Sequence, residues 1–245
     1  MARQSTLNAK NLEALGAARL AELLLTLSEG DAGAKRLLRL ALAEQKGPAE
    51  IAREVRKRLA TIERSGSFLD DDQRDKLLKD LERQRQAISG PIAEHDPALA
   101  VELFWDLLGL AEGLIDRCDD SDAVVRDFFH TCSAVLGQVA QKAPGDPKAL
   151  ADQVYAAIVS NGYGQFDPIL RDLGPALGPA GLGHLRQRLE ALRARVTSNG
   201  QAKTHRELTV RIAMLGIADA LCDAEAYLAE YRDHDPEALK VPAIA

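Results

Sequence analysis

One stretch of the chain, residues 96–140, constrains the fold more than any other. Its leucines recur every three or four residues, the period of an α-helix, and acidic side chains occupy the opposite side. It also holds the only tryptophan of the chain and three of the five phenylalanines. The pattern predicts two long helices, joined by a tight polar corner at residues 119–122 and buried between neighbours.

The other segments show the same period with fewer large side chains. Gly, Pro and Asp-Pro signals separate them, and no segment alternates in the way that predicts a strand. Aromatic residues make up only 4% of the chain, so Leu, Ala, Ile and Val must form most of the core. The sequence therefore predicts an all-α fold of about ten antiparallel helices, arranged as hairpins in the manner of an α-solenoid.

Two successive helices near the N-terminus differ from the rest because each has only a narrow apolar stripe. Residues 51–62 and 77–88 carry these stripes among many Arg, Lys, Glu and Asp residues. They predict a charged αα-hairpin within an N-terminal part, residues 1–90. Residues 91–245 are then the main helical array, although the two parts could also form one continuous domain.

The clearest sequence signal for the start of a helix is an Asp followed by a Pro, because Asp can cap a helix that begins with Pro. This pair occurs at Asp96, Asp146 and Asp235. The corner at residues 161–167 leads into a short helix expected to end near Leu173. The Gly-Pro pairs at 174–175 and 178–179 are expected to break the chain before a helix over residues 179–196.

Charge and composition exclude several classes of protein. The net charge is −6, which argues against a surface made for nucleic acid. Basic residues do gather in 52–64 and 186–211, but acidic residues lie among them and aromatic residues are few. No apolar run approaches the roughly 20 residues of a membrane span. Three cysteines without a repeated spacing favour reduced thiols, so we expect a cytoplasmic protein that does not enter membranes.

No constellation of residues predicts catalysis, a cofactor or a metal. The acidic corner at residues 116–122 offers oxygen ligands but lacks the Gly and the distal Glu of a calcium loop, so helix capping is the better interpretation. Cys118, His130 and Cys132 fail as zinc ligands, because residues 130 and 132 lie on different sides of one helix. The glycines of 178–183 do not match a phosphate-binding loop. We assign no catalytic, cofactor-binding or metal-binding residue.

Several segments together resemble a known family. These are NLEALGAARLAELLLTLSEGD, GPAEIAREVRKRLATIERSGSFLD, DRCDDSD, NGYGQFD and LGPALGPAGLGHLRQRLEAL. They are similar to an uncharacterised family of bacterial, all-helical proteins, and the likeness covers most of the chain. The resemblance implies helix-pair repeats of tetratricopeptide or HEAT character and no assigned activity. It also implies longer relatives with further repeats, which leaves open whether this chain is a short form or a fragment.

The favoured hypothesis is a non-catalytic helical-repeat scaffold that binds another protein, since stacked helix pairs form extended surfaces. The polar residues to test first are Asp119, Asp120, Tyr163, Gln165 and Asp167, whose simpler role is in corners and caps. The alternative is a ligand-binding protein or enzyme with a site between helices near Asp119, Asp120 and the 163–167 turn, lined by Trp105. Nucleic-acid binding through the two basic helices is the third hypothesis.

Overall fold

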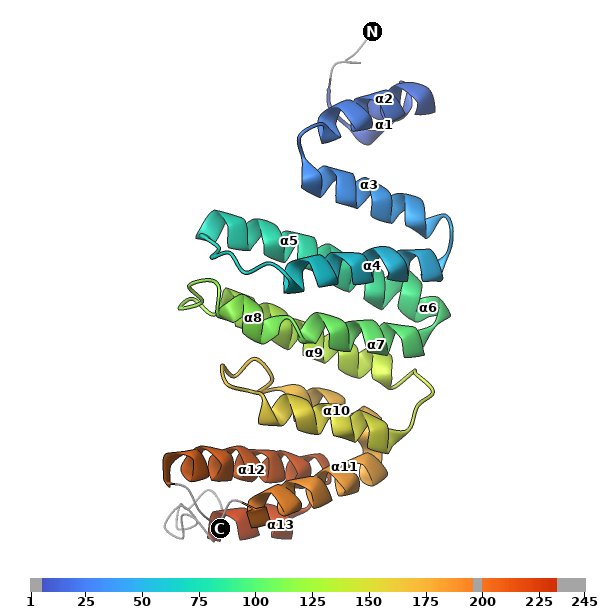
Figure 1. Cartoon of the computed structure of the whole chain (residues 1–245). Helices are drawn as coiled ribbons and strands as arrows, with labels where there is room; N and C mark the ends of the chain where they lie inside the picture. Colours follow the sequence, from blue (N-terminus) through green and yellow to red (C-terminus); the bar gives the residue numbers. More distant parts are fainter. Residues whose placement is uncertain (1–5, 196–199, 233–245) are drawn as a thin grey trace. The chain divides into compact units, whose positions relative to one another are not determined.

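The computed structural model describes residues 6–195 and 200–232, with the backbone alone for residues 200–206. The described residues form helices and connecting turns, and they contain no β-strand (Figure 1). A single bridge between Leu69 and Cys118 is the only β-type pairing among them. The predicted all-α class is therefore confirmed. The third Asp-Pro start, at Asp235, lies outside the described residues.

The chain divides into two compact units, residues 1–54 and 55–245. The first unit contains α1 (Ala9–Glu13), α2 (Ala17–Ser28), α3 (Ala32–Glu44) and the start of α4 (Pro48–Glu63). The unit boundary lies inside α4, between Glu54 and Val55. The sequence predicts a division at residue 90 instead, inside the helical segment that follows α5. That division, like the alternative of one continuous domain, stays a prediction.

The second unit continues from the rest of α4 through a series of helices. These are α5 (Asp71–Ala87), the π-helix η1 (Ile88–Ile92), α6 (Ala93–His95), α7 (Pro97–Leu108), α8 (Ala111–Ile115), α9 (Val124–Ala140), α10 (Pro147–Val159), α11 (Ile169–Arg195), α12 (Gly200–Ala220) and α13 (Ala224–Arg232). The charged helices α4 and α5 are joined by an ion pair, in which Arg58 Nε lies 2.6 Å from Asp80 Oδ2.

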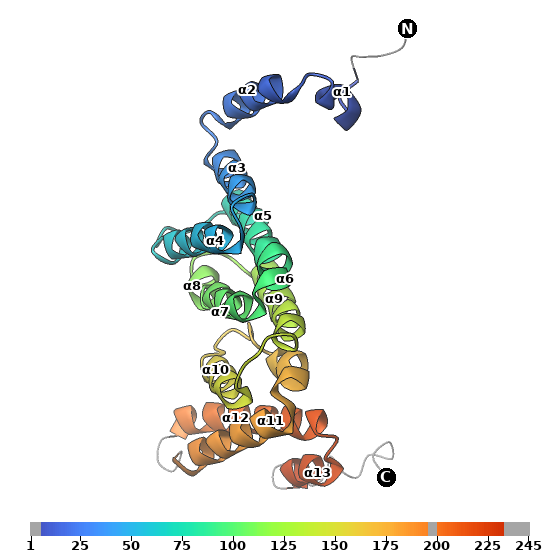
Figure 2. The same cartoon turned by 90° about the vertical axis from the view of Figure 1, so that its right-hand side faces the viewer.

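Two layers make up the middle of the second unit. α7, α8 and α10 lie on one side, while α9 and the first part of α11 lie on the other (Figure 2). α7 packs on α9, α10 packs on α11, and α9 also packs on α11. We call α9 and the first part of α11 the back layer. This layer supports both α7 and α10, which are exposed to solvent on the same side.

The stretch 96–140 supplies much of the core of this unit, as its pattern predicts. Phe104 of α7 and Phe129 of α9 are completely buried, together with Leu103, Leu107 and Leu136. The close approach of α9 and α11 depends on a small residue. A Cβ atom added to Gly137 would lie only 2.1 Å from the backbone carbonyl oxygen of Asp172.

The helix boundaries differ from the predicted ones at two places. The first long helix of the 96–140 stretch is interrupted at Gly109–Leu110, which separates α7 from α8. The second begins at Val124, directly after the predicted corner, where Ala123 turns the chain in a left-handed conformation with φ of 62°. The predicted break at residues 174–175 is wrong: the helix continues past Leu173 and is interrupted at Gly178, whose φ of 54° favours glycine.

Both Asp-Pro starts within the described part form helix caps as predicted. The Asp96 carboxylate accepts a hydrogen bond from the Leu99 amide at 3.0 Å, and that of Asp146 accepts one from the Lys148 amide at 2.9 Å. Each satisfies one of the backbone amides that the first turn of a helix leaves without a partner. These caps fix where α7 and α10 begin.

Candidate functional site

The acidic corner between α8 and α9 serves as a helix cap. The Asp120 carboxylate accepts hydrogen bonds from the amides of Val125 at 2.7 Å and Arg126 at 3.2 Å, near the start of α9. Asp119 accepts a hydrogen bond from the Ser121 amide at 3.0 Å, and this bond lowers the pKa of Asp119. The capping interpretation of the corner is therefore confirmed, because its carboxylates bind backbone amides.

A buried arginine ties the same corner to α5. The Arg74 guanidinium donates to the backbone carbonyl of Asp119 at 2.9 Å and lies 3.2 Å from Asp122 Oδ2. It also lies 3.3 Å from the carboxylate of Asp75. The described residues contain no group of three or more His, Cys, Asp and Glu residues placed to hold a metal ion. The corner thus functions as a joint between helices.

The turn at residues 161–167 is also held by its own polar groups. Gln165 is completely buried: its side-chain oxygen accepts from the Tyr163 amide at 2.9 Å, and its amide group donates to the Ser160 carbonyl at 3.0 Å. The Asp167 carboxylate accepts from the side-chain amide of Asn161 at 2.7 Å. These bonds give Tyr163, Gln165 and Asp167 the corner role that the sequence offers as the simpler one.

Two contacts bring this turn to the end of α8. The Tyr163 hydroxyl donates a hydrogen bond to the Asp116 carboxylate, which raises the pKa of Tyr163. From α9, the His130 ring lies 2.8 Å from the carbonyl oxygen of Gly164. The turn and the acidic corner are therefore near neighbours. The structure does not unite the five predicted residues in one pocket, because Asp120 binds amides at the start of α9 and Asp119 binds an amide within the loop.

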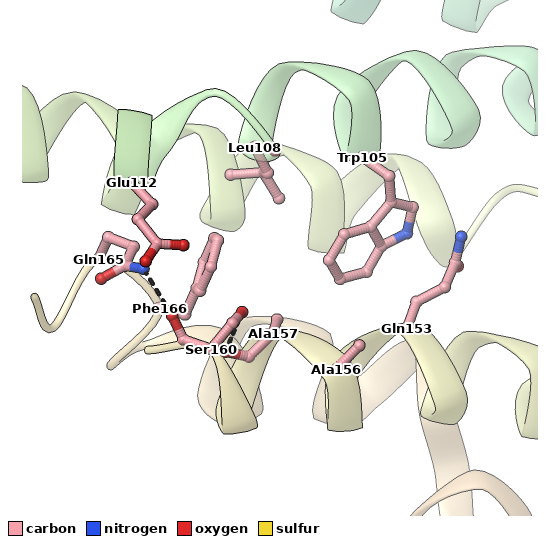
Figure 3. Close-up of a pocket in the computed structure, with 10 residues that line it drawn as sticks. Trp105, Leu108, Glu112, Gln153, Ala156, Ala157, Ser160, Gln165 and Phe166 are labelled. Atoms are coloured by element: carbon pink, nitrogen blue, oxygen red, sulfur yellow. Dashed lines mark hydrogen bonds between the residues drawn. The ribbon is translucent and has the colours of Figure 1, made fainter. Parts of the chain in front are cut away.

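A pocket of about 250 Å³ opens next to this turn, between α7–α8 and α10. Figure 3 shows the side chains of Trp105, Leu108 and Glu112 pointing from α7–α8 toward α10. Phe166 and Gln165 lie at one end. The pocket is lined by Trp105, Leu108, Gly109, Glu112, Gln153, Ala156, Ala157, Ser160, Gln165 and Phe166. We call it the Trp105 pocket.

A smaller pocket of about 160 Å³ adjoins it toward the starts of the same two helices. Its lining residues include Ala98 and Val101 of α7 and Ala149, Leu150 and Gln153 of α10. Because Gln153 lines both pockets, they form neighbouring parts of one depression, which we call the α7–α10 groove. α7 and α10 run in the same direction along it, since residues early in both helices line the small pocket.

Small side chains make the room in this groove. Ala149, Gln153 and Ala156 follow one side of α10 at helical spacing and are exposed, while Gly109 stands opposite, between α7 and α8. Trp105 Nε1 is buried and has no hydrogen-bond partner. Of these groove residues, the sequence pointed only to Trp105 and Gln165. Small or polar residues on a helix face do not indicate, from the sequence alone, which other helix packs opposite them.

The described residues show no arrangement typical of a nucleophile and its base. Burial raises the pKa of the Cys132 thiol, and it also raises that of Cys118, so both thiols stay protonated at neutral pH. His130 faces the Gly164 carbonyl, and His184 faces the Asp152 carboxylate at 2.8 Å on the surface between α10 and α11. Neither histidine faces a thiol or a hydroxyl in these contacts.

The remaining predicted residue, Asp167, lines a separate pocket of about 190 Å³ beside α12.

Among the described residues, no helix combines the length and the apolar character that crossing a bilayer requires. Comparison with curated proteins finds no match, and comparison with solved structures finds none either. One protein family does match, over residues 2–245, and it is described as a family of unknown function. The match covers nearly the whole chain, including both units and the α7–α10 groove. The chain therefore belongs to the family of unknown function DUF6880.

Proposed function

We propose that this chain is a non-catalytic helical-repeat scaffold that binds a short segment of another protein in the α7–α10 groove. The observation that supports this most is the pair of adjoining pockets between two parallel helices. Stacked helix pairs commonly present such elongated surfaces to partner chains. The back layer of α9 and α11 holds both walls, so the groove needs no partner in order to form.

The open form of the two adjoining pockets favours a peptide over a small molecule. Sites for small molecules commonly measure roughly 300 to 1,000 Å³ and enclose most of the ligand. The two pockets here measure about 250 and 160 Å³ and are open to solvent. Each is suited to a single side chain, so a segment with two apolar anchors fits the groove better than a metabolite does.

The buried indole nitrogen of Trp105 supports the same conclusion. A buried donor without a partner costs about 1 to 3 kcal/mol of stability, so natural proteins rarely retain one. Trp105 Nε1 is in this state in the unbound chain. Because this nitrogen is closed to solvent, the indole ring must turn before a carbonyl oxygen of a bound segment accepts its hydrogen and recovers part of that cost.

The other two hypotheses have weaker support. An enzyme at the Trp105 pocket would have Glu112 as the only charged group among the lining residues, without a second acid, base or nucleophile beside it. For nucleic acid, several arginines of the basic helices are engaged: Arg58 with Asp80, Arg188 with Asp152 and Arg193 with Glu230. A protein partner in the cytoplasm remains the proposal, consistent with three free cysteines.

The groove can be tested in the cell that makes this protein. A photo-crosslinking amino acid is placed at Ala156, inside the groove, and in a separate variant at Val159, which is exposed on the same helix and lines neither pocket. We expect a partner that crosslinks from position 156 and not from position 159. The crosslinked segment is then identified by mass spectrometry.

The affinity of the purified partner completes the test. Ala156→Phe fills the Trp105 pocket without removing a contact, and we expect it to weaken binding at least about tenfold, since 1.4 kcal/mol corresponds to that factor. Val159→Phe is the matched control and should leave the affinity unchanged. Equal affinity of both variants and the unaltered chain would show that the groove is not the binding site.

A further inference from the structure

We infer that the segment bound in the α7–α10 groove is basic, with its Lys or Arg residues next to the larger of its two apolar anchors. This inference rests on the proposed function and specifies the partner's chemistry. It follows from the charges that line the groove, from the direction of the two helices and from the unequal size of the two pockets.

The charged residues that line the groove are all acidic. Glu112 lines the Trp105 pocket and Asp146 lines the smaller one, while neither lining set contains Lys, Arg or His. The Asp146 carboxylate is already engaged in the cap of α10. Glu112 is exposed and forms no ion pair within the described part of the chain, so its carboxylate is available to a bound cation.

The backbone dipoles also make the Trp105 pocket more negative than the smaller pocket. α10 ends at Val159, so its C-terminal end lies at the Trp105 pocket, whereas the end of α7 at Leu108 is followed at once by the start of α8 and adds little. A helix carries a partial negative charge at its C-terminal end and a partial positive charge at its N-terminal end. Asp116 lies on the same side, bound by the Tyr163 hydroxyl. The potential is therefore most negative at the Trp105 pocket.

Basic residues of the chain do not cancel this potential. Arg56 pairs with Glu102, and Arg188 pairs with Asp152, which is also bound by His184. Arg117, which follows α8, donates to the backbone carbonyls of Gly113 and Ser65 and is therefore directed toward another loop. Lys148 lies at the opposite end, in the first turn of α10. A cation of the partner is thus favoured beside Glu112.

The distance between the pockets sets the spacing of the anchors. Val101 lines the small pocket and Leu108 lines the Trp105 pocket, seven residues further along α7. With a rise of 1.5 Å per residue, Val101 and Leu108 lie about 10 Å apart along the axis of α7. This is the distance between residues i and i+7 of a helical peptide, a common pair of anchors in groove binding.

The test uses the only tryptophan of the chain as the reporter, because Trp105 lies in the groove. Four helical peptides without tryptophan carry Phe and Val seven residues apart. The first has three lysines beside the Phe, the second has them beside the Val, and in the third and fourth Gln or Glu replaces the lysines beside the Phe. Each is titrated while the fluorescence of Trp105 is followed.

We expect the peptide with lysines beside Phe to bind most tightly, followed by the Gln peptide and then the Glu peptide. Glu112→Gln should weaken the first peptide about threefold to fivefold, as expected for one exposed ion pair, and leave the Gln peptide unchanged. Glu190→Gln removes one charge from an exposed position on α11 and is the matched control. It should change neither affinity.

The possible outcomes separate the two proposals. Equal affinities of the Lys, Gln and Glu peptides, or tightest binding with lysines beside Val, would overturn the basic segment while the groove remains a peptide site. If no peptide changes the fluorescence of Trp105, or if Ala156→Phe does not weaken binding, the proposed function fails and this inference fails with it. The predicted ranking together with the Glu112→Gln effect supports both.

Discussion

At the scale of single residues, two glycines inside helices should respond in opposite ways to an added methyl group. Gly137→Ala places a Cβ atom 2.1 Å from the Asp172 carbonyl, so α9 and α11 must move apart. We expect a loss of about 1 to 3 kcal/mol in the free energy of unfolding. Gly183→Ala in α11 meets no atom within 4 Å and should stabilise by about 0.5 to 1 kcal/mol. Urea denaturation of both variants measures the difference.

The acidic corner gives a second prediction at this scale. Asp120→Ala removes the acceptor of two amides at the start of α9, so we expect a loss of about 1 to 2 kcal/mol in unfolding free energy. Asp119→Ala removes a bond to Ser121 within the loop and should cost less. Thermal unfolding compares the two. If peptide binding in the groove is lost in Asp120→Ala while the fold stays intact, the purely structural role of this corner is wrong.

At the scale of helices, the ion pairs between α10 and α11 should make stability depend on pH. Hydrogen bonds from Arg188 and His184 lower the pKa of Asp152 in the folded state. A lowered carboxyl pKa stabilises the fold above the unfolded value of about 3.9, and this contribution is lost as the pH falls below it.

Replacing Asp152 by Asn should therefore reduce stability near pH 7. The difference from the unaltered chain should shrink as the pH falls below about 4, where the carboxylate of the unaltered chain takes up a proton. Urea denaturation between pH 7 and pH 3 measures this, with Glu190→Gln on the exposed side of α11 as the control. A difference that stays constant down to pH 3 would contradict the role of the Asp152 pairs.

At the scale of the whole molecule, the two possible divisions predict different stable fragments. A fragment of residues 47–245 keeps α4 whole and contains the entire second unit. We expect it to unfold cooperatively. A fragment of residues 91–245 lacks Leu81 and Ile88, both completely buried, and it also lacks Arg74 beneath the acidic corner.

The shorter fragment should therefore be several kcal/mol less stable, because losing large buried side chains costs about 2 to 5 kcal/mol each. Circular dichroism during thermal unfolding compares the two fragments. Equal melting temperatures would instead support the division at residue 90 that the sequence predicts.

The local features of this protein can be read from its sequence. Helical periodicity, the Asp-Pro starts at Asp96 and Asp146, and the capping role of the acidic corner depend on residues close together in the chain. The break in α11 was foreseen as one of two Gly-Pro pairs. The helix runs through Pro175, where Leu173, Gly174 and Leu177 are buried, and it is interrupted at Gly178.

The candidate site depends on how distant helices are placed in the folded chain. The Trp105 pocket joins Trp105 to Ala156 and Ser160, about 50 residues later, because α9 and α11 hold α7 and α10 side by side. No local pattern specifies that pairing, since Ala149, Gln153 and Ala156 have the pattern of an ordinary exposed helix face. Helices form from interactions within a few residues, whereas a groove forms from the placement of helices that are distant in the chain.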